Sequence, residues 1–456
     1  MAILTNPIKK QVIQDLKTDM DSSGTHYYAV IGRSEPWDSA DTIPTAVNTA
    51  REERNFRLGL QSAKKVVDLS FCVPRYNWSS GAIYSQYDDA QVGYPTQTYY
   101  VMNDENQVYL CIQQARNSAG QAQVSTDQPS GGTDGVPFDT PDRYIWQFLY
   151  SIGAAAASKF MSANYIPVKL QGATDGSSTA AEVEQLAIQT AATTGQIIGY
   201  AVDSGGAGYT SSPTVTISGN GTGAKADATI SGTQVSKVTL IDSDDNYTMG
   251  SGYDYATVTV TGGGSPTKPA KVRAIFGSPL GLGGDPRDDL RATAIMMNAK
   301  PSGDESTDFI VGNDFRQVGL LKNPYPHSPD SAGDLFVQTT GIMLKKLSFS
   351  NVTSDFSADE LIEGETSGAK AYVDKVGTDE LFYHQNEETG FTDFSAAEQV
   401  TRSGGVGGGV GTTAASNPIT LSEIDTMSGE VLYIDNRAKV ARASDQTEDI
   451  KLVIQI

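Results

Sequence analysis

The 456-residue sequence has few of the residues that bind metal ions or act as nucleophiles. It holds three histidines, His26, His327 and His384, which lie far apart along the chain. Two cysteines are too few for a disulfide framework, and Cys72 and Cys111 each sit in an apolar run typical of a small buried hydrophobe. The HExxH pattern and the Cys/His zinc patterns are absent. We therefore expect free core thiols, no metal site and no cofactor.

Long apolar runs and clusters of basic residues are also missing. No segment approaches the roughly 20 apolar residues that a membrane span needs, and the short, lysine-containing start is unlike a secretory signal. Lysine and arginine total 33 against 54 aspartate and glutamate, a net charge of −21, which disfavours nucleic-acid binding. We expect a protein made in a cytoplasm, with no membrane and no nucleic acid among its partners.

Known catalytic and ligand-binding loops are not matched either. No GxSxG elbow presents a serine. The run 242–254 alternates acidic and amide side chains as a calcium loop does, but Tyr247 replaces its glycine and Tyr253 its glutamate; a hairpin turn between repeats is favoured. The glycine-rich run 404–411 lacks the strand and the GK[ST] of a phosphate loop, so we interpret it as a linker. The expectation is that the protein is not an enzyme.

Glycine, threonine, valine and tyrosine are abundant instead. The 46 glycines, set among β-branched and aromatic residues, are typical of short strands and turns. We predict a mainly β fold with minor helices.

Two stretches have helical periodicity. In the first, Asn6 can cap and Pro7 fits the first helical position. Its apolar residues then recur every four positions: Ile8, Val12, Leu16 and Met20. The second stretch, 46–67, mixes charges with apolar residues at helical spacing, and we predict a helix over its whole length. Those residues are Phe56, Leu60, Ala63 and Val67.

Other stretches predict strands. They are "YYAVIG" (27–32), "VVDLSFCVP" (66–74), a hairpin of "QTYYVM" and "QVYLCIQQ" turning through 103–106, "RYIWQFLYSI" (143–152) and "DIKLVIQI" (449–456). The alternation in 143–152 predicts a half-buried strand. That in 449–456 predicts a last strand tied into a sheet.

Two blocks contain internal duplications. In the first, Gly208-Tyr209 recurs as Gly252-Tyr253, and Thr214–Ile217 as Thr257–Val260. In the second, "DFSADELI" (355–362) recurs as "DFSAAEQV" (393–400), within an acidic segment, 351–400, of net charge −10. Such copies indicate duplicated all-β units.

We predict that both blocks are modules inserted into loops of a host domain. The first module covers 196–275. The second, 347–416, is acidic and carries the glycine-rich linker. The discontinuous host is then 1–195, 276–346 and 417–456.

The run "GRSEPW" poses a question of its own, because it packs varied chemistry into a short space. It comprises Gly32, Arg33, Ser34, Glu35, Pro36 and Trp37. Pro36 disfavours helix at Glu35 and lacks a donor, so the preceding strand should end here and the chain should turn. Arg33 and Glu35 can hydrogen-bond that corner, while Trp37 can bury its ring with one partner for its N–H.

This corner, with the C-terminal run 428–456, closely resembles the dimer-forming baseplate wedge subunit of T-even-type contractile-tailed bacteriophages. Smaller collinear matches are "VPRYNW" (73–78), "YLC" (109–111), "DRYIWQFLY" (142–150) and "DFRQVGLLKNP" (314–324). The C-terminal motif residues are Ser428, Gly429, Glu430, Tyr433, Asn436, Arg437, Asp445, Gln446, Thr447 and Glu448. The stretch 38–54 fits the family poorly, and both repeat modules depart from its pattern, resembling instead β-repeats of related marine phages.

The resemblance implies a structural virion protein of the tail baseplate, assembled in the host bacterial cytoplasm. Its fold would be a layered β-sandwich host with helix-bearing loops. Its partners would be a second copy, as a homodimer, and other baseplate wedge proteins, and its role would be in wedge assembly and in the baseplate change on contraction. No catalytic residue or cofactor comes with the family. The alternative is a receptor- or glycan-binding tail fibre component; a polysaccharide depolymerase ranks third, because no acid pair stands out.

Overall fold

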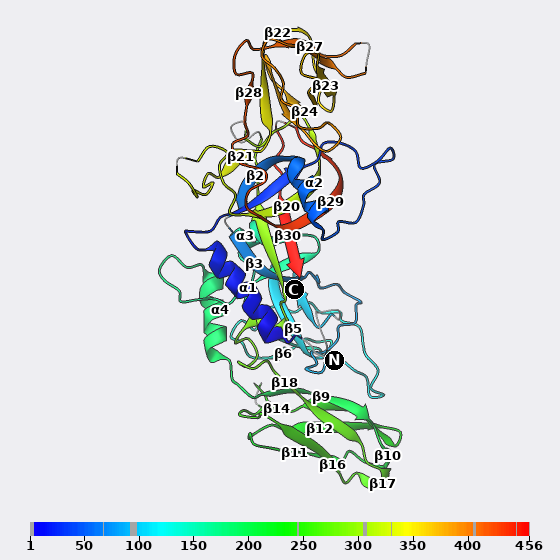
Figure 1. Ribbon diagram of the computed structural model, residues 1–456. Helices are drawn as coiled ribbons and strands as arrows, with labels where there is room; N and C mark the ends of the chain where they lie inside the picture. Colours follow the sequence, from blue (N-terminus) through cyan, green and yellow to red (C-terminus); the bar gives the residue numbers. More distant parts are fainter. Residues whose placement is uncertain are drawn as a thin grey trace. The chain divides into compact units, whose positions relative to one another are not determined.

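The computed structural model describes residues 4–66, 68–91, 98–243, 246–303, 308–329, 331–404, 407–443 and 445–455. Strands make up 40% of the structure and helices 11%, in several antiparallel sheets. The predicted mainly β fold with minor helices is therefore confirmed (Figure 1). None of the described helices is long and apolar enough to cross a membrane.

The chain divides into two compact units. Unit 1 comprises Met1–Ile13, Ser70–Met296 and Val453–Ile456, and unit 2 comprises Gln14–Leu69 and Met297–Leu452. Each unit thus contains one of the two repeat blocks. The three-segment host domain stays a prediction.

Unit 1 has an aromatic-rich sheet of order β4-β5-β7-β6. Its strands are β4 (Tyr100–Met102), β5 (Gln107–Gln113), β6 (Phe138–Asp139) and β7 (Ile145–Ser151). The predicted hairpin is confirmed, with Asn106 in the left-handed region (φ 58°). In β7, however, both faces are buried from Ile145 to Tyr150, so the half-buried prediction is wrong.

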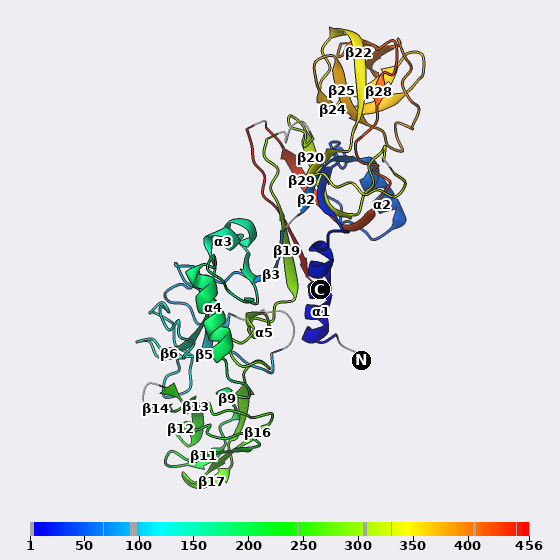
Figure 2. The same ribbon diagram turned by 90° about the vertical axis from the view of Figure 1, so that its left-hand side faces the viewer.

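A helix explains part of that burial. Helix α4 (Ala180–Ala191) begins with a capping box formed by Thr179 and Glu182. Its Ile188 is buried in the same cluster as Trp146 and Phe148 of β7. Figure 2 shows α4 standing beside this sheet. The shorter helix α3 (Ala154–Phe160) follows β7 directly.

A second sheet has four strands that come from distant parts of the chain. Its order is β30-β19-β3-β8. Its strands are β3 (Asp68–Pro74), β8 (Tyr165–Val168), β19 (Ala294–Ala299) and β30 (Ile450–Gln455). The last strand is tied into a sheet as predicted, with Ile450 and Leu452 buried. Cys72 in β3 and Cys111 in β5 are buried free thiols, also as predicted.

The first repeat block forms a six-stranded antiparallel sheet of order β13-β12-β11-β16-β18-β9. Its strands are β9 (Ile197–Ser204), β11 (Thr214–Gly219), β12 (Ala226–Ser231), β13 (Gln234–Leu240), β16 (Ala256–Thr261) and β18 (Lys271–Phe276). The two copies lie side by side, because β11 pairs with β16 and Thr216 faces Thr259.

Short ribbons complete this block. They are β10 (Ala207–Tyr209) with β17 (Gly264–Lys268), and β14 (Asp242–Ser243) with β15 (Asn246–Tyr247). The antiparallel pairing of β14 and β15 agrees with the predicted hairpin turn, whose central residues 244–245 lie outside the described residues. Both repeated tyrosines, Tyr209 and Tyr253, are buried.

Unit 2 is built on a five-stranded antiparallel sheet of order β21-β2-β1-β20-β29. Its strands are β1 (Tyr27–Gly32), β2 (Leu60–Val66), β20 (Asp314–Lys322), β21 (Thr340–Ile342) and β29 (Glu430–Ala441). The helix predicted over 46–67 is wrong in its second half, since α2 spans only Ala50–Leu58. Because Leu60–Ala63 are all buried between β1 and β21, tertiary pairing overrides the helical spacing there.

The predicted N-terminal helix is confirmed as α1 (Asn6–Met20). Its predicted apolar face is not buried: Ile8 and Val12 are 49% and 47% exposed, and Ile13 is the buried residue.

The second repeat block gives a seven-stranded antiparallel sheet of order β25-β24-β23-β26-β27-β22-β28, yellow to orange in Figure 2. Its strands are β22 (Lys345–Ser354), β23 (Leu361–Gly364), β24 (Lys370–Val376), β25 (Glu380–His384), β26 (Gln399–Arg402), β27 (Val410–Thr413) and β28 (Ile419–Thr420). The copies again lie side by side, because β23 pairs with β26 and Glu363 faces Thr401.

The glycine-rich run 404–411 is not wholly a linker. Its last residues belong to β27, and a Cβ on Gly409 would lie 1.9 Å from the Phe356 ring. A Cβ on Gly411 would lie 2.6 Å from Phe349. These glycines let the backbone pack against aromatic rings, so the linker interpretation is wrong for them; residues 405–406 lie outside the described residues.

A buried carboxyl group in unit 1 gives a first testable feature. Asp289 ends the short helix α5 (Pro286–Asp289) and is 0% exposed. Its Oδ1 lies 2.6 Å from Ser278 Oγ, and its Oδ2 accepts from the Gly283 amide at 3.0 Å. Ser278 Oγ also lies 2.9 Å from the Gly281 carbonyl oxygen. One hydroxyl proton cannot serve both, but a protonated Asp289 donating to Ser278 satisfies every group.

Burial raises the pKa of Asp289 from 3.8 to about 8, against its hydrogen bonds. The folded state therefore keeps a proton that the unfolded chain releases, so this contribution to stability is lost as pH rises toward about 8. In the unaltered chain the free energy of unfolding should fall by on the order of a few kcal/mol between about pH 5 and 8 because of this group. We expect Asp289→Asn, which mimics the protonated group, to abolish that fall. Urea unfolding at several pH values measures it. Asp288→Asn, at the neighbouring position, should keep the slope of unfolding free energy against pH. If Asp289→Asn kept the same slope as the unaltered chain, Asp289 would not be the group that holds the proton.

Candidate functional site

The corner 32–37 begins where β1 ends. A Cβ on Gly32 would lie 2.5 Å from the Gly59 carbonyl oxygen, so only glycine fits there. The next residue, Arg33, has a φ of 62°, which turns the chain out of the strand. Ser34 is buried and its carbonyl accepts from Arg316 Nη1. The predicted end of the strand and the turn are both present.

Two side chains of the corner stack on one another. The Arg33 guanidinium carbon lies 4.3 Å from the centroid of the Trp37 ring, and Arg33 Nη2 donates to the Pro36 carbonyl oxygen at 3.1 Å. The Trp37 ring is half-buried rather than enclosed, because a charged guanidinium, not the core, covers it. This arrangement holds the corner closed by a local cation–π contact.

The corner and the C-terminal motif meet. Trp37 Nε1 donates to the Arg437 carbonyl oxygen at 3.0 Å, across 400 positions of sequence. Nearby, Asn436 Nδ2 donates to the Pro44 carbonyl oxygen at 3.1 Å, and its Oδ1 accepts from Gln317 Nε2 at 2.8 Å. The single partner expected for the Trp37 N–H is thus a backbone atom of β29.

The start of the C-terminal motif is held by an arginine of α2. Arg57, 7% exposed, donates to the carbonyl oxygens of Ser428 at 2.7 Å and Gly429 at 2.8 Å. Gly429 has a φ of 69°, and a Cβ there would lie 2.6 Å from the Lys322 carbonyl oxygen. Arg57 therefore fixes the turn that leads into β29. Two further motif residues, Glu430 and Tyr433, lie in β29 opposite Lys322 and Leu320 of β20.

The end of the motif contains a buried ion pair. Arg442, 3% exposed, pairs with Glu448 at 2.7 Å. The Gly303 amide donates to the backbone carbonyl oxygen of Gln446 at 3.0 Å. Thr447 forms an isolated antiparallel β-bridge with Ser302. Asp445 is exposed. These contacts fold the residues after β29 back onto 302–303.

Sequence reasoning missed a cluster of charged groups around His384. Its Nδ1 lies 2.6 Å from Asp374 Oδ2 and its Nε2 lies 2.9 Å from Glu35 Oε1. Glu35 also accepts from Asn386 Nδ2 at 2.8 Å, and Asp374 from Gln61 Nε2 at 3.1 Å. Glu35, predicted to bond within its own corner, instead joins the corner to the second repeat sheet.

The charges in this cluster reinforce one another. Burial lowers the pKa of His384, but Asp374 and Glu35 outweigh it and hold that pKa well above its usual range. Burial raises the pKa of Glu35, but the imidazolium and its hydrogen bond lower it to about 2. With a carboxylate on each ring nitrogen, the imidazole has no nitrogen left for a nucleophile, so the cluster acts as a structural ion triad rather than a catalytic one.

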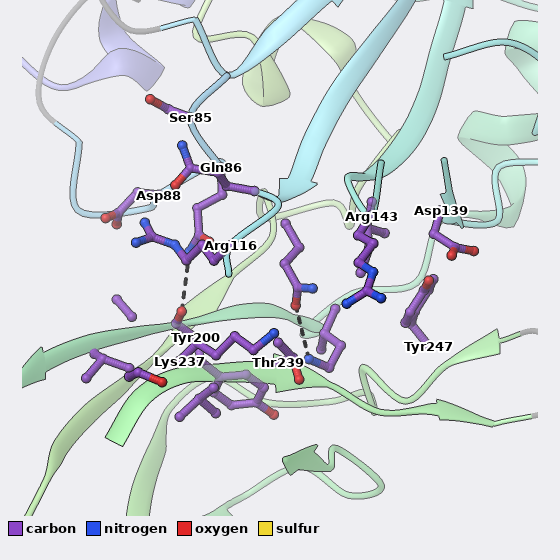
Figure 3. A pocket seen from close by; sticks show the side chains of 18 residues that line it. Ser85, Gln86, Asp88, Arg116, Asp139, Arg143, Tyr200, Lys237, Thr239 and Tyr247 are labelled. Atoms are coloured by element: carbon purple, nitrogen blue, oxygen red, sulfur yellow. Dashed lines mark hydrogen bonds between the residues drawn. The ribbon is translucent and has the colours of Figure 1, made fainter. Parts of the chain in front are cut away.

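A polar cavity of about 570 Å³ lies in unit 1 (Figure 3). It is lined by β9, β13 and β15 of the first repeat block and by segments around 85–88, 113–116 and 139–145. No group of three or more histidine, cysteine, aspartate or glutamate residues that could hold a metal ion is present in the described part of the chain. No sequence motif pointed to this cavity, because its walls come from segments distant in the chain.

Neither the protein-family models nor the curated protein sequences searched contain a match to this chain.

Proposed function

We propose that the protein is a structural virion protein: a baseplate wedge subunit of a contractile phage tail, built in as a homodimer against other wedge proteins. In this role it contributes to wedge and baseplate assembly and to the baseplate change on contraction. The proposal carries no catalytic residue and no cofactor.

The observation that carries the proposal is the contact between the two sequence signatures. The resemblance rested on segments at opposite ends of the chain, and Trp37 Nε1 bonds to Arg437 of the other segment. If the segments are one structural part, they should share contacts of this kind. Glu35 and Arg33 likewise bond to protein groups, to His384 and to Pro36, as expected for side chains whose role is to hold shape.

The choice of a structural role over an enzyme rests on how the charged groups are used. The His384 triad has its ring nitrogens bound to carboxylates, and Arg442 and Arg57 are bound to carbonyl oxygens of the chain. Buried charges of this kind fix the relative placement of segments. A wedge subunit that keeps its shape under the force of contraction needs such fixed placement.

The test compares corner variants with the unaltered chain. We expect Trp37→Ala and Arg33→Ala to lower the melting temperature and to weaken dimer formation and binding to wedge proteins, because each removes the Trp37–Arg33 stack. Trp37→Phe keeps a ring but loses the hydrogen bond to Arg437. Its melting temperature and its assembly should lie between those of the unaltered chain and of Trp37→Ala. Light scattering gives the dimer, and co-sedimentation with purified wedge proteins gives assembly.

Tyr255→Ala is the matched control, because this ring is 65% exposed; it should melt and assemble normally. A strictly monomeric unaltered chain that binds no wedge protein would sink the proposal. Corner variants that melt and assemble like the unaltered chain would show that the corner has no structural role.

A further inference from the structure

The cavity of unit 1 has walls that are tied together by hydrogen bonds. Gln86 Nε2 donates to the Tyr200 carbonyl oxygen at 3.3 Å, and the Leu240 amide donates to Gln113 Oε1 at 3.3 Å. Arg273 of β18 pairs with Asp88 at 2.6 Å. The cavity is therefore framed by fixed contacts between the first repeat sheet and the segments above it in Figure 3. A framed cavity of this volume is in the size range of ligand sites.

The cavity carries positive charge in an acidic protein. Arg116, Arg143 and Lys237 line it, and in Figure 3 Arg143 and Lys237 reach into the space from opposite walls. Within the described residues, neither Arg143 nor Lys237 makes an ion pair. Two carboxylates, Asp88 and Asp139, also line the cavity, and Asp88 pairs with Arg273, which Asp89 and Asp203 share. The lining thus has three cationic side chains against two carboxylates. A net positive cavity in a chain of net charge −21 attracts anionic groups.

The rest of the lining is rich in hydrogen-bonding groups. Thirteen of the eighteen lining residues have polar side chains, which is unlike the apolar pocket of a lipid or a drug-like ligand. Over the described ranges, Gln113 Nε2 and Gln86 Oε1 have no hydrogen-bond partner, so an NH2 group with two N–H donors and a carbonyl acceptor remain for a ligand. Tyr247 adds an aromatic ring at one end. Amides beside a ring suit a ligand with many hydroxyl groups and an apolar ring face.

We propose that this cavity binds an oligosaccharide that carries carboxylate groups, such as a chain of uronic acids. Arg143 and Lys237 contact the carboxylates, and Gln86, Gln113 and Thr239 hydrogen-bond the hydroxyl groups. The inference concerns unit 1 and goes beyond the structural role proposed above, whose supporting contacts all lie in unit 2. Neither proposal depends on the other.

The experiment uses the full chain and isothermal titration with trigalacturonic acid, a uronic-acid trimer, and with its methyl ester, which has the same rings without the charges. We expect saturable binding of the acid that weakens with salt, and no measurable binding of the ester. Arg143→Gln and Lys237→Gln should each raise the dissociation constant about tenfold, as the loss of one charge-assisted hydrogen bond does. Lys225→Gln, which removes an exposed lysine of the same block outside the cavity, should change nothing.

Several results would overturn the proposal. The first is no binding of trigalacturonic acid or of sialyllactose, a second acidic sugar used as a further probe. The second is equal binding of trigalacturonic acid and its methyl ester. The third is that Arg143→Gln and Lys237→Gln both bind trigalacturonic acid as tightly as the unaltered chain does. Binding of a hexaglutamate peptide as tight as that of the sugar would assign the cavity to an acidic segment of a protein partner. Circular dichroism of each variant separates loss of the ligand from loss of the fold.

Discussion

Replacing His384 with leucine is expected to lower the free energy of unfolding by about 3–5 kcal/mol, the usual cost of breaking a buried ion pair. Leucine fills similar space but leaves Asp374, 0% exposed, and Glu35 facing each other without the imidazolium between them. Two like charges then remain buried with fewer hydrogen bonds. Urea unfolding followed by tryptophan fluorescence measures the loss, and Trp37 lies two residues from Glu35.

The loss has a defined pH dependence. Because the pKa of His384 is raised, its contribution is fully present below its ordinary value of 6.5 and is lost only as pH rises through the raised value. Because the pKa of Glu35 is lowered from 4.5 to about 2, its contribution is present above 4.5 and is lost as pH falls toward 2. The difference in unfolding free energy between the unaltered chain and His384→Leu should therefore be largest between about pH 4.5 and 6.5. It should shrink as pH falls from 4.5 toward 2.

A second histidine gives the matched control. His327 in the same unit is exposed, and its Nδ1 is 3.4 Å from Ser422 Oγ. His327→Leu should change stability by no more than about 0.5 kcal/mol, as surface substitutions do. If both variants unfolded alike, the triad would not be a main support of the unit. The triple variant with Asp374→Asn and Glu35→Gln should recover part of the loss, because the charges leave together.

Replacing Arg442 with methionine is expected to cost a similar amount, about 3–5 kcal/mol. Its Nη1 donates to the carbonyl oxygens of Phe309 at 2.9 Å and Ile310 at 2.5 Å, and its Nη2 to Gly303 at 2.8 Å. The guanidinium carbon also lies 4.6 Å from the Phe309 ring centroid. Methionine keeps the apolar stem but leaves these carbonyls and Glu448 without their donor.

Arg437→Met is the control from the same motif, because that side chain is 50% exposed and only its backbone carbonyl bonds to Trp37. It should stay within about 0.5 kcal/mol of the unaltered chain. Arg442→Lys should be intermediate, since an ammonium group cannot match the planar fork of donors. Thermal melting and urea midpoints of the three variants decide the matter; equal stability of Arg442→Met and Arg437→Met would refute the burial argument.

Local chemistry in the sequence predicted local structure well. Pro36 after a β-branched strand predicted the corner, and the set 103–106 predicted the hairpin, because both signals act within a few residues. Strand β2 was missed because Leu60–Ala63 are buried on both faces. A strand of this kind does not alternate apolar and polar residues, so the helical spacing of the apolar residues was the only periodic signal in this stretch.

The important contacts of the site could not be predicted for a different reason. Glu35 and His384 are 349 positions apart, and Trp37 and Arg437 are 400 apart. One sequence carries no record of such pairs. His384 lies in an acidic segment without a metal-ligand pattern, so the sequence left open whether it is a surface or a core residue, and the fold buries it. The cavity of unit 1 could not be predicted for the same reason, since its cationic side chains come from separate segments.

The pairing of each duplicated strand with its own copy has a consequence for how the two blocks arose. Thr216 faces Thr259, the same position of the other copy, and Glu363 likewise faces Thr401. Antiparallel pairing centred on equivalent residues is the arrangement that two identical chains adopt about a two-fold axis. In each block, the two copies within one polypeptide therefore pair as the two subunits of a homodimer would. The covalent link replaces an encounter between chains with a high effective concentration. It also lets the two copies differ, as Glu363 and Thr401 do where the copies of the second block pair.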